Sequence, residues 1–403
     1  MRELHSNWKE VKLGDIVDIT MGQSPKSEFY NKRNEGMPFL QGSSTFGHLY
    51  PSFEIYSSDI KKIAVNGSIL MSVRAPVGDL NMANTDICIG RGLCSINGKN
   101  KSLNRYIFYL LNYYKSKIVN IQTGTVFGAI SKDNILNFKV SIPQSEKEQK
   151  YIASILSSFD DKIELNNKTN KILEEMAQTI FKEWFINFNF PNEDGKPYKK
   201  SGGEMIDSEL GKIPKGWKIG TIGDYAKLKS GFAFKNSWWQ NDGIPVIKIQ
   251  NISSGNLNLE QCSFVSEDKY NIAENFRVNG GDLLITLTGS LGKFTIVPKL
   301  DKDALVNQRV GKFFLGEEPV KKLPFLYGIL NELKDLIVSL ANGSVQQNIS
   351  PNDVENVKII FPNDKILNKY NNLMQDIFYK IIFNQRENKK LSNIRDSLLP
   401  KLM

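Results

Sequence analysis

Residues that could form a catalytic centre are few in this chain. The sequence has only two histidines, His5 and His48, which are too few for a histidine-rich metal site and do not favour a Ser-His-Asp triad. The cysteines Cys88, Cys94 and Cys262 lack the C-x-x-C spacing of zinc sites. We therefore predict no catalytic residue and no metal site, and we expect the thiols to be reduced, as in a cytoplasmic protein.

Two short segments resemble enzyme motifs without matching them. Residues 289–293 (Gly-Ser-Leu-Gly-Lys) look like a phosphate-binding loop, but they lack the G-x-x-x-x-G-K-[ST] spacing. Asp194 and Lys196 have the spacing of half a nuclease motif, but they lie in a stretch rich in proline and glycine. No Pro-Pro pair occurs, so the Asp/Asn-Pro-Pro-aromatic tetrad of an amino-methyltransferase is absent. These features favour recognition over catalysis.

The charge balance favours a polyanionic partner. The 403 residues carry a net charge of +9, with a pI near 9.1, and the basic residues are spread along the chain rather than gathered in a tail. The N-terminus has no apolar run typical of a signal peptide. No stretch approaches the roughly 18 apolar residues of a membrane span. We expect a soluble, cytoplasmic protein.

The same sequence pattern occurs twice. Residues 8–15 (Trp-Lys-Glu-Val-Lys-Leu-Gly-Asp) return as residues 217–224 (Trp-Lys-Ile-Gly-Thr-Ile-Gly-Asp), and Ile130-Ser131 returns as Ile349-Ser350. Solenoid repeats have periods of roughly 20–50 residues, so a period above 200 residues indicates two whole domains of one kind. In each copy, short β-like runs (67–73 and 282–287) precede helical runs (103–119 and 323–340), which predicts mixed α/β domains.

Each copy is followed by a heptad pattern. Its members are spaced alternately by four and three residues, which is typical of helices that pair along their length. In the first helix, predicted from residue 145 to about 187, they are Ile152, Leu156, Phe159, Ile163, Asn166, Asn170, Leu173, Ala177 and Ile180. In the second helix they are Tyr370, Met374, Ile377, Ile381, Asn384, Asn388, Leu391, Arg395 and Leu398, at a constant offset of 218 residues.

Asparagines at such positions weaken a coiled coil but fix its register. If the helices run antiparallel, Asn166 meets Asn388 and Asn170 meets Asn384; the alternative is that these amides are solvated where the helices diverge. The predicted fold is thus mixed α/β, with two similar globular domains separated by two long antiparallel coiled-coil helices and related by an internal pseudo-two-fold repeat. The predicted boundaries are 1–143 (first domain), 144–188 (first helix), 189–216 (connector), 217–362 (second domain) and 363–403 (second helix).

Taken in order, several segments resemble the specificity subunit of a type I restriction–modification system. They are the W-x-x-V-x-L-G-D pattern at 8–15, Arg-Ala-Pro-Val-Gly at 74–78, Thr-Gly-Thr at 123–125, Phe-Lys-Glu-Trp-Phe at 181–185, G-x-I-P-x-G-W at 211–217 and Arg-Asp-Ser-Leu-Leu-Pro-Lys-Leu at 395–402. The resemblance covers essentially the whole chain. It implies two target recognition domains, each reading one half of a bipartite, asymmetric site in double-stranded DNA.

The resemblance also implies the partners. The paired helices set the unread spacer between the half-sites and bind two methyltransferase subunits, and restriction subunits complete the complex. S-adenosylmethionine (AdoMet), ATP and Mg²⁺ belong to those partners, so no cofactor is expected in this chain.

The candidate reading residues are side chains that suit base edges: arginine for guanine, asparagine or glutamine for adenine, and serine or threonine for either. Glycines beside them would let backbone amides approach phosphates. In the first domain the candidates are Gln41, Ser43, Ser44, Arg74, Arg91, Thr123, Gly124 and Thr125. In the second domain they are Lys248, Gln250, Asn251, Thr288, Ser290, Arg309, Ser344, Gln346 and Gln347, with Arg309 as the expected equivalent of Arg91.

Other interpretations stay open from the sequence. The chain could be a non-catalytic helical scaffold without sequence-specific DNA reading, or an enzyme whose active site has no recognisable motif. Any candidate residue could instead lie in a solvated loop or make a structural hydrogen bond. The pair Trp238-Trp239 could be a wedge between bases, although adjacent tryptophans more often cover the edge of a core.

Overall fold

The structure is a computed structural model that describes residues 7–120, 128–253, 256–259, 262–341 and 347–403. The chain forms two compact units. The first unit is residues 1–165 with 388–403, and the second is residues 166–387. Each unit contains a mixed α/β domain and one segment of each long helix, so the predicted mixed α/β repeat is confirmed.

The first unit contains two main sheets. The antiparallel sheet has the order β2-β10-β7-β8, and the mixed sheet has the order β3-β5-β4-β9-β6, in which β4 and β9 are parallel. The strands of these sheets are β2 (Val17–Met21), β3 (Tyr30–Asn31), β4 (Met37–Leu40), β5 (Tyr56–Ser57), β6 (Ile63–Ala64), β7 (Ile69–Ser72), β8 (Leu80–Met82), β9 (Ile87–Ile89) and β10 (Leu93–Gly98). A separate pair joins β1 (Trp8–Lys12) to β11 (Lys139–Pro143).

The second unit repeats this topology. Its sheets have the orders β15-β24-β21-β22 and β19-β16-β23-β20, with β16 and β23 parallel. These strands are β15 (Lys227–Ser230), β16 (Ile244–Ile247), β19 (Ser263–Val265), β20 (Arg277–Val278), β21 (Leu283–Thr286), β22 (Phe294–Ile296), β23 (Ala304–Val306) and β24 (Val310–Phe314). The remaining pairs are β14 (Lys218–Thr221) with β25 (Lys358–Phe361), and β17 (Ile252–Ser253) with β18 (Asn256–Leu257).

Gly22 and Gly231 occupy equivalent positions in the two units and are explained by close packing of the backbone. A Cβ atom on Gly22 would lie 2.1 Å from the carbonyl oxygen of Gly90, and one on Gly231 would lie 2.2 Å from that of Val306. In both units the chain that follows the first strand of the antiparallel sheet (β2 or β15) therefore lies directly against the end of β9 or β23. The predicted strand runs are present as β7 and β21, and every residue of both is buried.

Short helices flank the sheets. Each helical run predicted as continuous is broken in the structure, at Tyr114 in the first unit and at Leu333 in the second. The helices of the first unit are α1 (Leu13–Ile16), α2 (Asn104–Tyr113), α3 (Lys115–Val119) and α4 (Lys132–Leu136). Those of the second are α6 (Ile222–Tyr225), α7 (Glu267–Ile272), α8 (Leu323–Glu332), α9 (Lys334–Ser339) and α10 (Pro351–Glu355).

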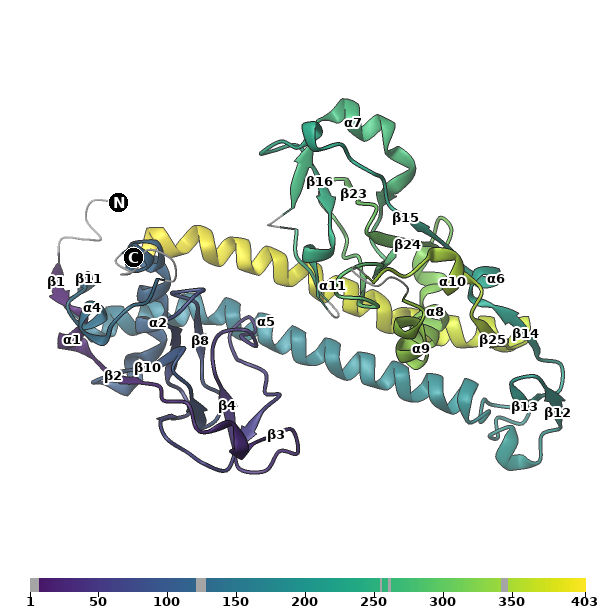
Figure 1. The fold of residues 1–403 in the computed structure, drawn as a ribbon, viewed down its shortest axis with the longest axis horizontal. Helices are drawn as coiled ribbons and strands as arrows, with labels where there is room; N and C mark the ends of the chain where they lie inside the picture. The colour runs from purple at the N-terminus through teal and green to yellow at the C-terminus, as the bar shows by residue number, and fades with distance from the viewer. Residues whose placement is uncertain (1–6, 121–127, 254–255, 260–261, 342–346) are drawn as a thin grey trace. The chain divides into compact units, whose positions relative to one another are not determined.

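The two long helices are α5 (Glu146–Phe181), which continues as a π-helical turn over Lys182–Ile186, and α11 (Asp364–Leu402). In the second unit they are antiparallel, because Asn170 meets Asn384 whereas the later Phe181 meets the earlier Tyr370. Figure 1 shows α8 and α9 (green) beside the first part of α11 (yellow).

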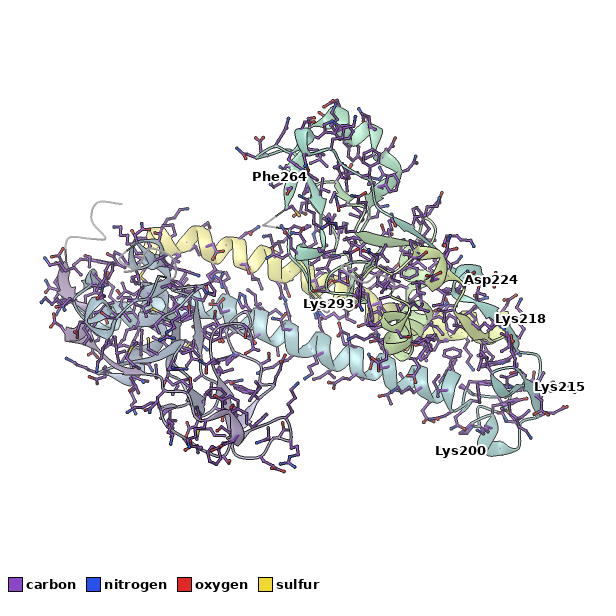
Figure 2. The ribbon with its side chains drawn as sticks, in the orientation of Figure 1. Lys200, Lys215, Lys218, Asp224, Phe264 and Lys293 are labelled. Carbon is purple, nitrogen blue, oxygen red and sulfur yellow. The ribbon has the colours of Figure 1, made fainter. Side chains whose placement is uncertain are left out.

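The connector packs on the core of the second unit. Phe190 stacks on Trp217, with ring centroids 4.9 Å apart, and on Tyr198 at 4.6 Å. Its hairpin consists of β12 (Met205–Ser208) and β13 (Gly211–Pro214). Lys215, labelled in Figure 2, forms an ion pair with Glu204 at 2.8 Å. The predicted exposed connector is thus partly folded, since its aromatic residues complete an apolar core.

Candidate nucleic-acid interface

In the first unit, the ends of several strands meet at one edge of the sheets. Gly90, which follows β9, donates its backbone N–H to the carbonyl of Leu40 at the end of β4 (2.8 Å). Gln23, which follows β2, donates to Ile89 (2.9 Å). The loops after β2, β4 and β9 therefore lie side by side, as expected where parallel strands end together.

The second unit builds the same edge. Asn307 donates its N–H to the carbonyl of Ile247 (2.9 Å), and Phe232 donates to Val306 (2.8 Å). These bonds correspond one for one to those of the first unit. Lys293, labelled in Figure 2, lies in the loop between β21 and β22. Both units thus present a cluster of loops held by a rigid pair of sheets.

The polar candidates of the first unit lie in this loop cluster. Ser24 donates its hydroxyl to the side-chain oxygen of Gln41 (2.8 Å) and accepts the backbone N–H of Arg91 (3.2 Å). Ser43 donates to Asp79 (3.1 Å), and Ser44 is exposed. The amide group of Gln41 is exposed and retains donors for a base edge, whereas the hydroxyl of Ser43 is engaged with a carboxylate.

Two arginines of the first unit have guanidinium groups available for a ligand. Arg74 follows β7 and Arg91 lies in the turn between β9 and β10, and both are exposed. Neither guanidinium forms a hydrogen bond or an ion pair with any residue that the structure describes. A planar group with five donors suits the paired acceptors of guanine or a phosphate.

In the second unit, Lys248 takes the place of Gln41, because each follows the strand end that accepts the bonds described above. Its ammonium donates to the hydroxyl of Ser263 (2.7 Å) and lies 3.6 Å from the ring centroid of Trp239. Burial lowers the pKa of Lys248 below its ordinary value. The ring and the hydroxyl hold the ammonium in one place, which reduces the entropy lost when it binds a ligand.

Of the other candidates in the second unit, some are exposed and some are not. The exposed ones are Gln250, Ser290, Arg309 and Gln347. Asn251 is 2% exposed and accepts the backbone N–H of Lys248, and Thr288 is 6% exposed and bonds to Asn348. The side chains of Asn251 and Thr288 thus make structural hydrogen bonds within the protein.

The expected equivalence of Arg91 and Arg309 is wrong by one residue. In the first unit, Val73 donates its N–H to the carbonyl of Gly92 (2.9 Å), and the matching bond of the second unit joins Leu287 to Arg309 (3.0 Å). Arg309 therefore takes the place of Gly92. The offset between the copies is 217 residues in this turn rather than 218, a difference that sequence spacing alone did not reveal.

Five candidates lie outside the described residues: Thr123, Gly124, Thr125, Ser344 and Gln346. The chain next to both segments is described. Ala129 forms a β-bridge with Arg74, and Asn348 forms one with Thr288. The residues that follow these two segments therefore lie beside the loops after β7 and β21.

Trp238 and Trp239 cover the edge of a small core. Trp238 stacks on Phe232 with ring centroids 5.9 Å apart, and Trp239 packs on Phe234 at 5.5 Å. Both indoles are half-buried. This packing matches the expectation that the two tryptophans cover the edge of a core. Insertion between bases is not needed to explain why they are adjacent.

The heptad residues of both long helices are all buried or half-buried. Asn384 donates its side-chain amide to Asn170 (2.7 Å), the pair expected of antiparallel helices. Asn166 donates to the carboxylate of Glu387 (2.7 Å). The expected pairing of Asn166 with Asn388 stays a prediction.

Sequence reasoning missed a buried charge on α5. Asp160 lies next to the heptad residue Phe159, and its side chain is 1% exposed, bonded to His48, Tyr109 and Arg395. Its three partners lie between 51 and 235 residues away from Asp160 in the sequence. No local pattern indicates such a cluster.

In the part of the chain that the structure describes, no three histidine, cysteine, aspartate or glutamate side chains are grouped so as to hold a metal ion. Among the helices described, none is long and apolar enough to cross a membrane. Cys88, Cys94 and Cys262 are buried and form no disulfide.

Comparison with known proteins gives consistent results. The sequence matches the family described as "Type I restriction modification DNA specificity domain" over residues 5–175 and again over 214–393. It is 29% identical to the type I restriction enzyme MjaIX specificity subunit of Methanocaldococcus jannaschii, across 100% of this chain and 94% of that protein. It is 24% identical to the HindI specificity subunit of Haemophilus influenzae, across 99% of both.

A solved structure shows the same fold. The crystal structure of a type I restriction–modification S subunit from M. genitalium matches with a TM-score of 0.57 at 16% identity, covering 98% of this chain and 96% of that chain. The strand order, the loop cluster and the long helices recur in two copies here, and the two matched ranges take up most of the sequence. The chain therefore belongs to the type I restriction–modification DNA specificity family.

Proposed function

We propose that this chain is the sequence-specific DNA-reading subunit of a type I restriction–modification complex, and that each unit reads one half of a bipartite, asymmetric site. The observation that carries the proposal is that both units form the same loop cluster but have different side chains at corresponding positions in it. Gln41 in the first unit corresponds to Lys248 in the second. Glutamine suits adenine and lysine suits guanine, so the two units favour different half-sites.

The proposed reading residues are those whose side chains are available at this edge. In the first unit they are Gln41, Ser44, Arg74 and Arg91, with Ser43 as a support through Asp79. In the second they are Lys248, Gln250, Ser290, Arg309 and Gln347. Asn251 and Thr288 are left out because they are buried, whereas Thr123, Gly124, Thr125, Ser344 and Gln346 stay predictions.

The proposed division of the chain follows the sequence boundaries. Residues 1–143 and 217–362 read DNA, residues 144–188 and 363–403 form the spacer helices, and residues 189–216 connect them. The chain itself is not a catalyst. Two methyltransferase subunits bring AdoMet, and restriction subunits bring ATP and Mg²⁺. The free, buried cysteines suit a reducing cytoplasm.

The test is methylome sequencing of a methylation-deficient host that expresses the chain with its methyltransferase subunit. We expect methylated adenine at one gapped, asymmetric motif. Replacing residues 1–143 with the corresponding domain of another specificity subunit should change one half of the motif, and replacing residues 217–362 should change only the other. A stable complex with an active methyltransferase but no methylated motif would instead favour a helical scaffold.

Arg74→Ala is expected to weaken binding to the specific duplex by about 1–3 kcal/mol, the range for losing a bidentate contact with a base. The side chain is exposed, and among the described residues no hydrogen bond or ion pair to its guanidinium is found, so folding should tolerate the change. Fluorescence anisotropy with the methyltransferase complex measures this change. The matched control is Arg33→Ala, since Arg33 is also exposed but pairs with Glu35. Equal affinities for both variants would contradict a reading role for Arg74.

A further inference from the structure

A buried carboxylate joins four segments of the first unit. Asp160, in α5, accepts hydrogen bonds from Nε2 of His48 (2.8 Å) and from the hydroxyl of Tyr109 (2.5 Å). It also forms an ion pair with the guanidinium of Arg395 in α11. His48 lies in the loop after β4, and Tyr109 lies in α2. Asp160 thus connects the loop after β4 and helix α2 to the two long helices, α5 and α11.

The hydroxyl of Tyr109 and the guanidinium of Arg395 both donate to Asp160, which suits a charged carboxylate. Since an ionised carboxylate only accepts hydrogen bonds, Nε2 of His48 is assigned as a third donor. The guanidinium of Arg395 lies 3.2 Å from the same nitrogen, and two donors at this distance need an acceptor between them. Burial by itself raises the pKa of Asp160, but the bond from His48 and the positive charge of Arg395 bring it below its ordinary value.

The second unit has apolar residues at the corresponding positions. The offset of 218 residues between the long helices matches Asp160 with Phe378, and Arg395 with Ala177. Phe378 is fully buried and packs against Tyr327, with ring centroids 5.2 Å apart. The two domains are therefore attached to their helices differently, the first through a charge cluster and the second through rings.

We propose that Asp160 is a positioning residue, which fixes the angle of the first domain on its helix segments and thereby restricts the length of the DNA spacer that the chain accepts. The inference rests on the proposed function, because a spacer exists only if two half-sites are read. In this role the buried cluster contributes the preference for one spacer length, which no contact with a base supplies. It also gives the Arg395 segment, found in the sequence as a motif, a defined role.

The geometry of DNA makes this role measurable. One extra base pair moves a half-site by roughly 3.4 Å along the duplex and rotates it by about 35°, since one turn holds 10–10.5 base pairs. Ile152, Ala153 and Leu156 attach the domain to α5 through apolar contacts, and such contacts have no directional preference. Hydrogen bonds weaken steeply with angle. Loss of the carboxylate should therefore free the rotation while the domain stays attached.

The experiment compares Asp160→Asn with the wild-type chain, both as complexes with the methyltransferase subunits. Two duplexes carry the motif found by methylome sequencing, one with its native spacer and one with a spacer longer by one base pair. The quantity measured is the dissociation constant for the longer spacer divided by that for the native spacer. We expect Asp160→Asn to reduce this ratio about tenfold, because the variant should discriminate less against the longer spacer. A general loss of stability lowers the active fraction equally for both duplexes and leaves the ratio unchanged.

The matched control is Asp161→Asn, which removes the neighbouring carboxylate. Asp161 is 57% exposed and pairs with Arg105 (2.8 Å), and exposed ion pairs contribute little, so its ratio should equal that of the wild type. If Asp160→Asn does not fold, Tyr109→Phe replaces it under the same criterion. A wild-type ratio in the folded variant, or an equal reduction in Asp161→Asn, overturns the inference but not the proposed function. A wild-type complex that methylates no motif overturns both.

Discussion

Replacing Phe181 with alanine is expected to lower the free energy of unfolding of the second unit by about 3–5 kcal/mol, the usual cost of removing a buried phenylalanine ring. The ring is 1% exposed and lies 5.0 Å from Phe185, 6.0 Å from Phe325 and 6.2 Å from Tyr370, between ring centroids. It therefore ties α5 to both α8 and α11, and its loss leaves a cavity that three elements share.

The packing around this ring leaves little scope for relaxation. A Cβ atom on Gly328 would lie 2.1 Å from the ring of Phe181, so the ring rests against the bare backbone of α8. Backbone that is held within a helix cannot move into the space as a flexible side chain would. The cost should consequently fall within the range for rigid sites, where the cavity persists.

Thermal unfolding followed by tryptophan fluorescence measures the effect in the relevant unit. Four of the five tryptophans, at positions 184, 217, 238 and 239, belong to the second unit. We expect the midpoint of this transition to fall by on the order of 10 °C. The control is Ile172→Ala, because Ile172 lies on the same helix but is 57% exposed. If both variants lower the midpoint equally, Phe181 does not hold the three helices together.

The repeated architecture was predictable because its signals are local. The strands β7 and β21 are apolar runs bounded by turn residues, and the heptad seam follows from spacing alone. Small insertions in the loops leave both signals intact, because each signal lies within a single strand or helix. The seam even identified the pair Asn170 and Asn384, because an antiparallel arrangement that aligns the asparagine positions of the two helices places these residues opposite each other.

Details that depend on distant residues were not predictable. The turns after β9 and β23 each hold three residues, and Arg309 stands where the first unit has Gly92; only the hydrogen bonds reveal this equivalence. Asn251 and Thr288 look like surface loop residues, yet tertiary packing buries them. Asp160 directly follows a heptad residue, and a sequence pattern cannot show that a domain covers that face of the helix.

Two equivalent exposed apolar residues favour binding of two copies of one partner. Met176 in α5 and Ile394 in α11 are 47% and 45% exposed, and they are separated by the same 218 residues that relate the two heptad series. Met176 belongs to the second unit and Ile394 to the first. Single exposed apolar side chains are ordinary on protein surfaces, so Met176 and Ile394 carry weight only through their equivalent positions on the two helices.

Met176→Asp and Ile394→Asp are each expected to remove one methyltransferase subunit from the complex, and the double variant is expected to remove both. A carboxylate that must lose its water in an apolar interface costs several kcal/mol, and each 1.4 kcal/mol weakens binding about tenfold. The fold should tolerate both changes, since the side chains already face solvent. Native mass spectrometry distinguishes the complexes by the number of bound subunits.

The conservative variants Met176→Leu and Ile394→Leu are the matched controls, because they keep the apolar surface and nearly the same volume. They should keep both methyltransferase subunits of the proposed complex. Equal loss of both subunits from each single aspartate variant would mean that the two surfaces act together rather than separately. Retention of two subunits by both single variants would place the docking surface elsewhere on the chain, and the pseudo-two-fold repeat of the helices would then serve spacing alone.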